Sequence, residues 1–316
     1  MISTFRKWLI GPSAILLTAC GGAEQDRTEA ADRSSDAANT LFRYNREYVF
    51  IGSGGTDPTI VPFTFRSSER GDELDRGVQA WLARGGTWER FLDETATTSA
   101  AGGVWRVTPQ PDLQVTVGGP AELEALRFER GERRLRLELE RPITGWQQGG
   151  ESRFRLLSGQ LAVGSETLTG PVLEMLRVER TLADGWPPAQ DFDAIFLTSG
   201  DSIQLVLAET IGGAEADERY AWTRTSAGER MWPEAEVRWL EFRAYEEARR
   251  DIPRRWSFHI PAAGIQGELE ASGFDAVLGP ERAGRRAVEI RYTVQGWIDM
   301  PGGRRDAAGL IRHTQQ

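Results

Sequence analysis

The strongest constraint on the fold is an alternation of apolar and polar side chains, with a period of two, that recurs along much of the chain. Single polar residues separate Trp256, Phe258 and Ile260 in one run, and Leu135, Leu137 and Leu139 in another. Successive side chains of a β-strand point to opposite faces, so this pattern predicts sheets with one apolar and one solvated face. The chain is therefore expected to be mostly β.

Residues that favour tight turns separate these runs. Turns are predicted at 129–132, 199–202 and 301–303, each of which contains glycine. The 35 glycines and 15 prolines of the chain suit many short strands joined by tight connections. We predict a mostly antiparallel β architecture that closes into barrels, because closure leaves no sheet edge exposed.

Two segments fit more than one kind of element. Residues 72–84 fit a helix with Leu74, Val78 and Leu82 on one face, although Gly77 weakens that helix by about 1 kcal/mol. Residues 234–250 are charged and rich in helix formers, but their larger side chains also alternate as in a strand. For this second segment we favour a strand through Phe242, followed by a charged turn or a helical cap.

The first 20 residues have the order of a cleaved bacterial signal. Arg6 and Lys7 precede an apolar run of about ten residues, which is shorter than the ~20 that a membrane-spanning helix needs. The run ends in Leu17-Thr18-Ala19-Cys20, which resembles the lipobox of bacterial lipoproteins, in which the cysteine is acylated and becomes the new N-terminus. The alternative is an ordinary signal peptide. Because Cys20 is the only cysteine, we expect a lipoprotein signal over 1–19 and lipidation of Cys20.

The residues after the cysteine predict a tether at the outer membrane. Residues 20–41 contain several acidic and small residues and no aromatic residue, so they bury too little apolar area to fold and are expected to be flexible. Gly21 and Gly22 follow the cysteine, and the lack of an adjacent aspartate resembles lipoproteins that are sorted to the outer membrane. More than one acyl chain holds a protein at a membrane stably. The expected location is the periplasmic side of the outer membrane.

Composition excludes several classes of function. The formal net charge is −9, which argues against nucleic acid as a partner. One cysteine and two histidines do not provide a disulfide framework or a Cys/His zinc site, so no metal is expected. The chain also lacks a Walker A loop, a Gly-x-Ser-x-Gly elbow and a complete Gly-x-Gly-x-x-Gly motif. We therefore expect no cofactor.

The second half of the chain contains a familiar order of motifs. A Pro-x-x-Trp-x-x-x-Ile-Pro run occupies 253–261, after the segments 191–196 and Trp222 and before a closing Tyr-Thr-Val-Gln-Gly-Trp at 292–297. This order resembles the hydroxyneurosporene synthase and AttH-like family, in which two lipocalin-like β-barrels pack side by side. The resemblance, with the irregular Gly-Trp-Pro-Pro near residue 185, implies one barrel over 42–184 and another over 185–316. Members include carotenoid hydratases, related isomerising or cyclising enzymes and lipid-handling proteins.

The resemblance also implies one candidate catalytic residue. Family enzymes carry an acid in a strand at the end of the first half, and Glu174 occupies the corresponding stretch, although the flanking tryptophan and histidine of the family are absent. A carboxylic acid kept neutral by an apolar pocket can protonate an alkene, and apolar residues surround Glu174 in the sequence. The alternative is a strand glutamate that pairs with Arg177, Arg180 or a cross-strand arginine.

Other polar residues are expected to be structural or solvated. Asp191 and Asp193 form an Asp-x-Asp that could bind a metal or act as a pair, but we expect them at a solvated strand entrance. His259 alternates with Trp256 and Phe258 and is expected to face solvent. His313 lies three residues from the end and is expected in a frayed tail.

Tryptophan is abundant, with ten of the 11 tryptophans after the leader. Their broad rings could line a cavity for a long apolar or polyene ligand, or they could fill the barrel cores. Trp81, Trp88 and Trp297 are the predicted ligand-facing residues.

Three hypotheses for function follow. The first is a lipid-tethered, lipocalin-like protein that binds a hydrophobic small molecule or lipid of a carotenoid-like or isoprenoid-like class. The second is a cofactor-free hydratase, isomerase or cyclase with Glu174 as general acid. The third is an accessory partner of an envelope ABC-type transport complex, which would need no cavity.

Overall fold

The computed structural model describes residues 40–52, 58–70, 73–99, 113–117, 123–148, 152–182, 191–200, 202–211 and 220–315. Nearly all of these residues lie in strands of two antiparallel sheets. The first sheet contains β1 (Thr40–Gly52), β2 (Thr59–Arg70), β3 (Glu73–Arg84), β4 (Thr87–Ser99), β5 (Leu113–Val117), β6 (Leu123–Arg130), β7 (Arg133–Gln148), β8 (Ser152–Val163) and β9 (Glu166–Leu182). The second contains β10 (Asp191–Ser199), β11 (Ile203–Ile211), β12 (Tyr220–Thr225), β13 (Gly228–Trp232), β14 (Glu236–Tyr245), β15 (Arg250–Ile260), β16 (Ile265–Arg282), β17 (Arg285–Met300) and β18 (Gly303–Gln315). A short 3-10 turn, Pro261–Ala263, links β15 to β16.

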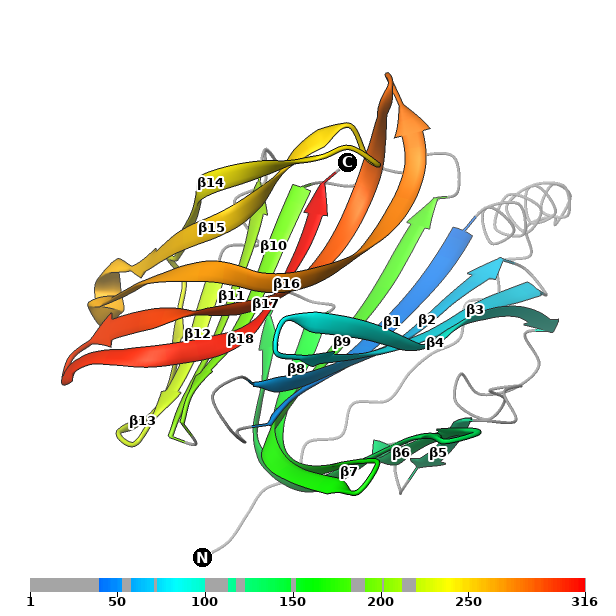
Figure 1. Cartoon of the computed structure of the whole chain (residues 1–316), viewed down its shortest axis with the longest axis horizontal. Coiled ribbons are helices and arrows are strands. Elements are labelled where there is room, and N and C mark those ends of the chain that lie inside the picture. The colour runs from blue at the N-terminus through cyan, green and yellow to red at the C-terminus, as the bar shows by residue number, and fades with distance from the viewer. Residues whose placement is uncertain are drawn as a thin grey trace, which may run out of the picture.

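The two sheets have the same topology. The strand order is β4-β3-β2-β1-β9-β8-β7-β6-β5 in the first and β13-β12-β11-β10-β18-β17-β16-β15-β14 in the second, which is the same order shifted by nine strands. In each sheet the first strand pairs with the last, so the chain within each half returns to its own beginning. The chain therefore consists of two topological copies, which pack side by side (Figure 1).

Each sheet curls so that strands far apart in its order meet through side chains. In the first sheet, Phe91 of β4 packs edge-on against Phe128 of β6 at 5.7 Å, and Arg130 of β6 pairs with Glu94 of β4 at 2.7 Å. In the second, Trp239 of β14 donates a hydrogen bond to Asp193 of β10 across the interior. These contacts give each half the lipocalin-like barrel form that the sequence predicts.

Each barrel has its own apolar core. Alternate residues of the strands point inward, as Tyr48 and Phe50 do on β1, and Ile290, Tyr292 and Val294 on β17. The opposite face of several strands also carries buried apolar residues, because it packs against the other barrel. This double burial produces three clusters, one inside each barrel and one between the barrels.

The cluster between the barrels combines stacked rings with buried charges. Trp146 of β7 stacks on Trp222 of β12 with ring centroids 4.1 Å apart. Two partly buried ion pairs also join the barrels: Arg66 of β2 contacts Glu289 of β17 at 2.7 Å, and Arg312 of β18 contacts Glu47 of β1 at 2.7 Å. Ion pairs of this kind require a fixed position of one barrel on the other.

The structure corrects the helix expected at 72–84. Residues Glu73–Arg84 form strand β3, with Val78 and Leu82 in the core of the first barrel. The spacing of four that suggests a helix also places these side chains on one face of a strand, because four is a multiple of two. Pairing with β2 and β4 decides between the two periods.

Strand β14 continues three residues beyond Phe242, to Tyr245, and the charged turn expected after it follows at 246–249. The leader, Cys20 and the tether up to residue 39 lie outside the described residues, as does the predicted boundary between 184 and 185. The last described strand of the first sheet ends at Leu182, and the second sheet begins at Asp191. Within the described part of the chain, no helix has the length and apolarity needed to cross a membrane.

Candidate functional site

A carboxylate–imidazole pair lies inside the second barrel. Asp193 and His313 are direct neighbours across the paired strands β10 and β18, and the side chains of both are fully buried. His313 Nδ1 lies 2.7 Å from Asp193 Oδ1, and Trp239 Nε1 donates a hydrogen bond to the other carboxylate oxygen at 2.6 Å. Because an ionised carboxylate only accepts hydrogen bonds, this arrangement places the proton of neutral His313 on Nδ1.

Polar atoms around this pair have no hydrogen-bond partner within the described part of the protein. They are His313 Nε2, the Tyr292 hydroxyl and Trp256 Nε1. The ring centroid of Tyr292 lies 6.3 Å from that of His313 and 4.9 Å from that of Trp256, so the three side chains belong to one cluster. A buried polar group without a partner costs about 1–3 kcal/mol. The interior of the second barrel therefore contains a group of polar atoms whose hydrogen-bonding capacity is not met by the described residues.

The electrostatic surroundings keep the Tyr292 hydroxyl protonated. Burial raises the pKa of Tyr292, and the nearby Asp193 carboxylate adds to this effect, although the Arg243 guanidinium opposes it. Arg243 itself lies 3.8 Å from the ring centroid of Phe274, at the same end of the barrel. Tyr292 is therefore a hydrogen-bond donor at neutral pH.

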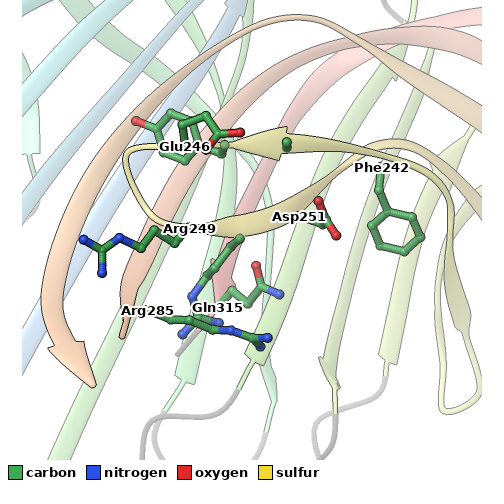
Figure 2. Close-up of a pocket in the computed structure, with 9 residues that line it drawn as sticks. Phe242, Glu246, Arg249, Asp251, Arg285 and Gln315 are labelled. Carbon is green, nitrogen blue, oxygen red and sulfur yellow. The ribbon is translucent and has the colours of Figure 1, made fainter. Parts of the chain in front are cut away.

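A pocket of about 510 Å³ opens at the end of the second barrel, beneath the β14–β15 hairpin. Figure 2 shows Glu246 and Arg249 at the hairpin tip, with Arg285 and Gln315 facing the hairpin from β17 and β18. Gln315 follows His313 by two residues, so both side chains lie on the same face of β18. The pocket is therefore the mouth of the barrel, and the Asp193–His313 pair lies deeper along the same wall.

The predicted catalytic residue, Glu174, lies inside the first barrel instead. Its side chain is only 3% exposed; it accepts a hydrogen bond from the Tyr48 hydroxyl at 3.0 Å, and it contacts Arg46 at 3.2 Å and Arg155. Arg155 is its neighbour across β8 and β9. Both oxygens of Glu174 are therefore engaged by protein groups, which is the arrangement of the cross-strand ion-pair alternative.

The three predicted ligand-facing tryptophans do not gather at the pocket. Trp81 is fully buried between the sheets, where its Nε1 donates to Asp275 at 2.7 Å and its ring lies under Arg291. Trp88 packs against the apolar cluster between the barrels, and the ring of Trp297 lies beneath the guanidinium of Arg304. None of the three borders the pocket at the mouth of the second barrel.

Two expectations about polar residues are wrong. Asp193 does not lie at a solvated strand entrance, and His313 does not lie in a frayed tail, because both are fully buried in paired strands. The sequence contains a signal for this placement: an even number of residues separates His313 from Ile311 and Ala307, and Asp193 from Ile195, so each lies on the same strand face as these core residues. His259 is exposed, as predicted.

Metal binding would require acidic, histidine or cysteine side chains grouped together in the described ranges. Among the described residues, no group of three or more His, Cys, Asp or Glu side chains is arranged to hold a metal ion. The candidate site thus consists of one carboxylate, one imidazole, one phenol and indole rings, a set suited to proton transfer and hydrogen bonding.

Comparisons with known proteins address the fold. No family model matches the chain, and no curated protein sequence matches it. Among solved structures, an AttH protein from Nitrosomonas europaea has a TM-score of 0.58 at 13% sequence identity, over 86% of this chain and 92% of its own. Kievitone hydratase from Nectria haematococca has a TM-score of 0.54 at 12% identity, over 89% of this chain and 90% of its own. The protein therefore has the AttH-like fold of two lipocalin-like β-barrels that its sequence predicts.

Proposed function

We propose that this protein is a lipid-anchored protein of the outer membrane, on the periplasmic side, that binds an apolar small molecule inside its second barrel. The observation that carries the proposal is the set of three buried polar atoms, on His313, Tyr292 and Trp256, that lack a hydrogen-bond partner among the described residues, in an interior that is largely apolar apart from the Asp193 carboxylate. A ligand with an apolar skeleton and one polar oxygen would bury its hydrocarbon against the core and satisfy these atoms. An isoprenoid-like molecule with a hydroxyl group fits this description, because the hydroxyl can donate to His313 Nε2 and accept from Tyr292 and Trp256, whereas a carbonyl oxygen would satisfy only the two donors.

The route to the interior runs along strand β14. This strand is an edge of the second sheet, and its pairing with β15 shifts register at Trp239/Glu241 and again at Glu241/Phe242. Pro253, which faces Phe242 across the pair, has no amide hydrogen to donate. A strand with this interrupted ladder opens at lower cost than a central strand.

The outer surface of β14 is suited to an apolar ligand. Leu240 is 43% exposed and Phe242 is 53% exposed, and they are the large exposed hydrophobic residues among those described. Phe242 also lines the pocket at the barrel mouth. An apolar molecule that arrives from a membrane would meet these side chains first.

Membrane attachment is tested through Cys20. We expect the protein to incorporate labelled palmitate in bacterial cells and to fractionate with the outer membrane, because acyl chains on the cysteine hold it there. The Cys20→Ser variant should lose both the label and the membrane association. A wild-type protein that carries no label and remains in the periplasmic fraction would contradict the anchor.

Ligand binding is tested by native mass spectrometry of protein extracted from membranes in mild detergent. We expect a co-purified adduct with the mass of an apolar small molecule. Tyr292→Phe should weaken retention about fivefold to tenfold, since it removes one hydrogen bond worth about 1 kcal/mol. The matched control is Tyr48→Phe, which removes a hydroxyl in the first barrel and should not affect retention.

Two outcomes would overturn the ligand proposal. The first is the absence of any adduct. The second is co-purification of envelope transport proteins without a small molecule, which would favour the role of an accessory partner of an ABC-type complex. The hydratase hypothesis with Glu174 as general acid has less support, because Arg46, Arg155 and Tyr48 already engage that carboxylate.

A further inference from the structure

We propose that Asp193 and His313 form an acid–base pair that moves a proton on a ketone bound in the second barrel. The inference rests on the proposed function, because it requires a ligand in that barrel, and it adds a catalytic site and a substrate class. The site lies away from Glu174, the residue for which the sequence predicts catalysis. It is formed by the first and last strands of the second sheet.

The geometry orients His313 as a proton acceptor. Asp193 Oδ1 lies 2.7 Å from Nδ1 and holds the proton there, so the lone pair of neutral His313 lies on Nε2. Trp239 fixes the carboxylate through its second oxygen and packs edge-on against the imidazole at 5.2 Å. Nε2 is buried and has no partner in the described protein, so it is available to a ligand atom.

Tyr292 supplies the second group that a ketone needs. Its ring centroid lies 6.3 Å from that of the His313 imidazole, and its buried hydroxyl has no acceptor among the described residues. A phenol that keeps its proton can donate a hydrogen bond to a carbonyl oxygen, and it stabilises the negative charge that develops there when a neighbouring carbon loses a proton. The apolar core around these groups suits the hydrocarbon part of the substrate.

The proton transfer needs no other reactant. His313 Nε2 takes a proton from the carbon next to the carbonyl, and the electron pair of that C–H bond forms a C=C bond while the carbonyl oxygen becomes an enolate held by Tyr292. The imidazolium then returns the proton. Return to the same carbon regenerates the ketone, and return to the far end of a conjugated dienolate shifts a double bond. Neither outcome oxidises or reduces the substrate.

The test uses the bicyclic ketone 2-decalone as the probe and the intact, acylated protein. Binding is measured by quenching of tryptophan fluorescence. Proton transfer is measured in heavy water, by the exchange of the hydrogens on the carbons next to the carbonyl for deuterium. We expect the wild-type protein to accelerate exchange above the buffer rate. His313→Gln should lower this acceleration about 100-fold or more while the probe still binds. His259→Gln, which changes an exposed histidine, should retain the wild-type rate.

Tyr292→Phe provides a second test if His313→Gln does not fold. The hydroxyl has no hydrogen-bond partner among the described residues, so the variant should keep the native near-ultraviolet circular dichroism while exchange falls about tenfold or more. Binding of the probe without faster exchange would overturn this inference alone. Wild-type exchange in folded His313→Gln or Tyr292→Phe would do the same. A probe that does not bind at all would overturn the proposed ligand class, and this inference with it.

Discussion

At the scale of the residue, the two barrels differ in whether a buried tyrosine hydroxyl has a hydrogen-bond partner among the described residues. Tyr48 in the first barrel donates to Glu174 at 3.0 Å, whereas the hydroxyl of Tyr292 in the second has no partner among the described residues. A satisfied hydroxyl stabilises the fold, and an unsatisfied one destabilises it. The difference separates a structural tyrosine from one that is available to a ligand.

This contrast gives a paired prediction. Tyr48→Phe should lower the free energy of unfolding by about 1–2 kcal/mol, because it leaves a buried carboxylate with one donor fewer. Tyr292→Phe should leave the stability of ligand-free protein unchanged or raise it slightly, since it removes an unsatisfied polar group. Urea unfolding followed by tryptophan fluorescence measures both values. A loss of more than about 1 kcal/mol in Tyr292→Phe would mean that its hydroxyl has a structural partner.

Glu174 is predicted to be structural at the same scale. Glu174→Gln leaves Arg46 and Arg155 without their shared carboxylate, and breaking a buried ion pair in this way costs about 3–5 kcal/mol. The same change at exposed Glu236 should have little effect on the unfolding free energy. A folded, wild-type-stable Glu174→Gln protein that loses turnover of an alkene substrate would instead favour the general-acid hypothesis.

At the scale of the element, one contact between the two barrels is that of the β3–β4 hairpin with strand β16 (Figure 1). Strand β16 has a register shift between Ala271 and Gly273, which bends it at this point. A Cβ atom at Gly273 would overlap the backbone of Gly86 in the hairpin turn, so the contact requires glycine. The bulge and the hairpin turn are therefore fitted to one another.

We predict that Gly273→Ala separates this hairpin from β16. The added methyl group meets backbone atoms that cannot move aside as a side chain would, and we expect a loss of about 1–3 kcal/mol in the free energy of unfolding. Gly77→Ala is the matched control, because a Cβ at Gly77 makes only ordinary contacts at 3.9 Å. Hydrogen exchange of the 84–87 amides should rise in Gly273→Ala alone. Equal effects of the two substitutions would contradict the close packing.

The elements also show how far the sequence alone predicts this structure. The alternation of apolar and polar residues predicts the strands, because it is a local pattern that can be recognised over a few consecutive residues. Many such strands separated by turns then predict the barrel class. The alternation cannot separate a helix from a strand at 72–84, where both periods place Leu74, Val78 and Leu82 on one face. Alternation does not predict the Asp193–His313 pair for a different reason: its members are 120 residues apart, and only the pairing of β10 with β18 brings them together.

At the scale of the whole molecule, the shared topology explains why a site arises in this place. Pairing of the first and last strands of each half sets residues from the two ends of that half side by side. In the first barrel this pairing brings Tyr48 to Glu174, and in the second it brings Asp193 to His313. The same position in two copies of one fold thus carries a fully engaged ion pair in one and a partly unsatisfied cluster in the other.

The interface between the barrels includes a group of charges that is largely shielded from solvent. Burial alone would raise the pKa of Glu289, but the guanidinium groups of Arg291, Arg312 and Arg66 outweigh burial and lower it to about 2. Arg66 lies on the first barrel and the other two on the second, so the charge of Glu289 helps to hold the barrels together. The side chain of Arg291 has no exposed surface, and the carboxylates of Glu289 and Glu47 compensate its buried charge.

The lowered pKa predicts a loss of stability in acid. The unfolded chain binds a proton at Glu289 near its ordinary pKa of 4.5 and the folded protein only near 2, so the contribution is complete above 4.5 and disappears as the pH falls toward 2. Its full size is at most about 3 kcal/mol.

Unfolding free energies at pH 7 and pH 3 should therefore differ less in Glu289→Gln than in the wild type, and the variant should already be less stable at pH 7. The control, Glu270→Gln, alters an exposed pair with Arg254 and should retain the wild-type pH dependence, since a surface ion pair contributes little. If Glu289→Gln and the wild type lost stability in parallel between pH 7 and pH 3, the acid sensitivity would have to arise from other carboxylates, and the charges between the barrels would not govern it.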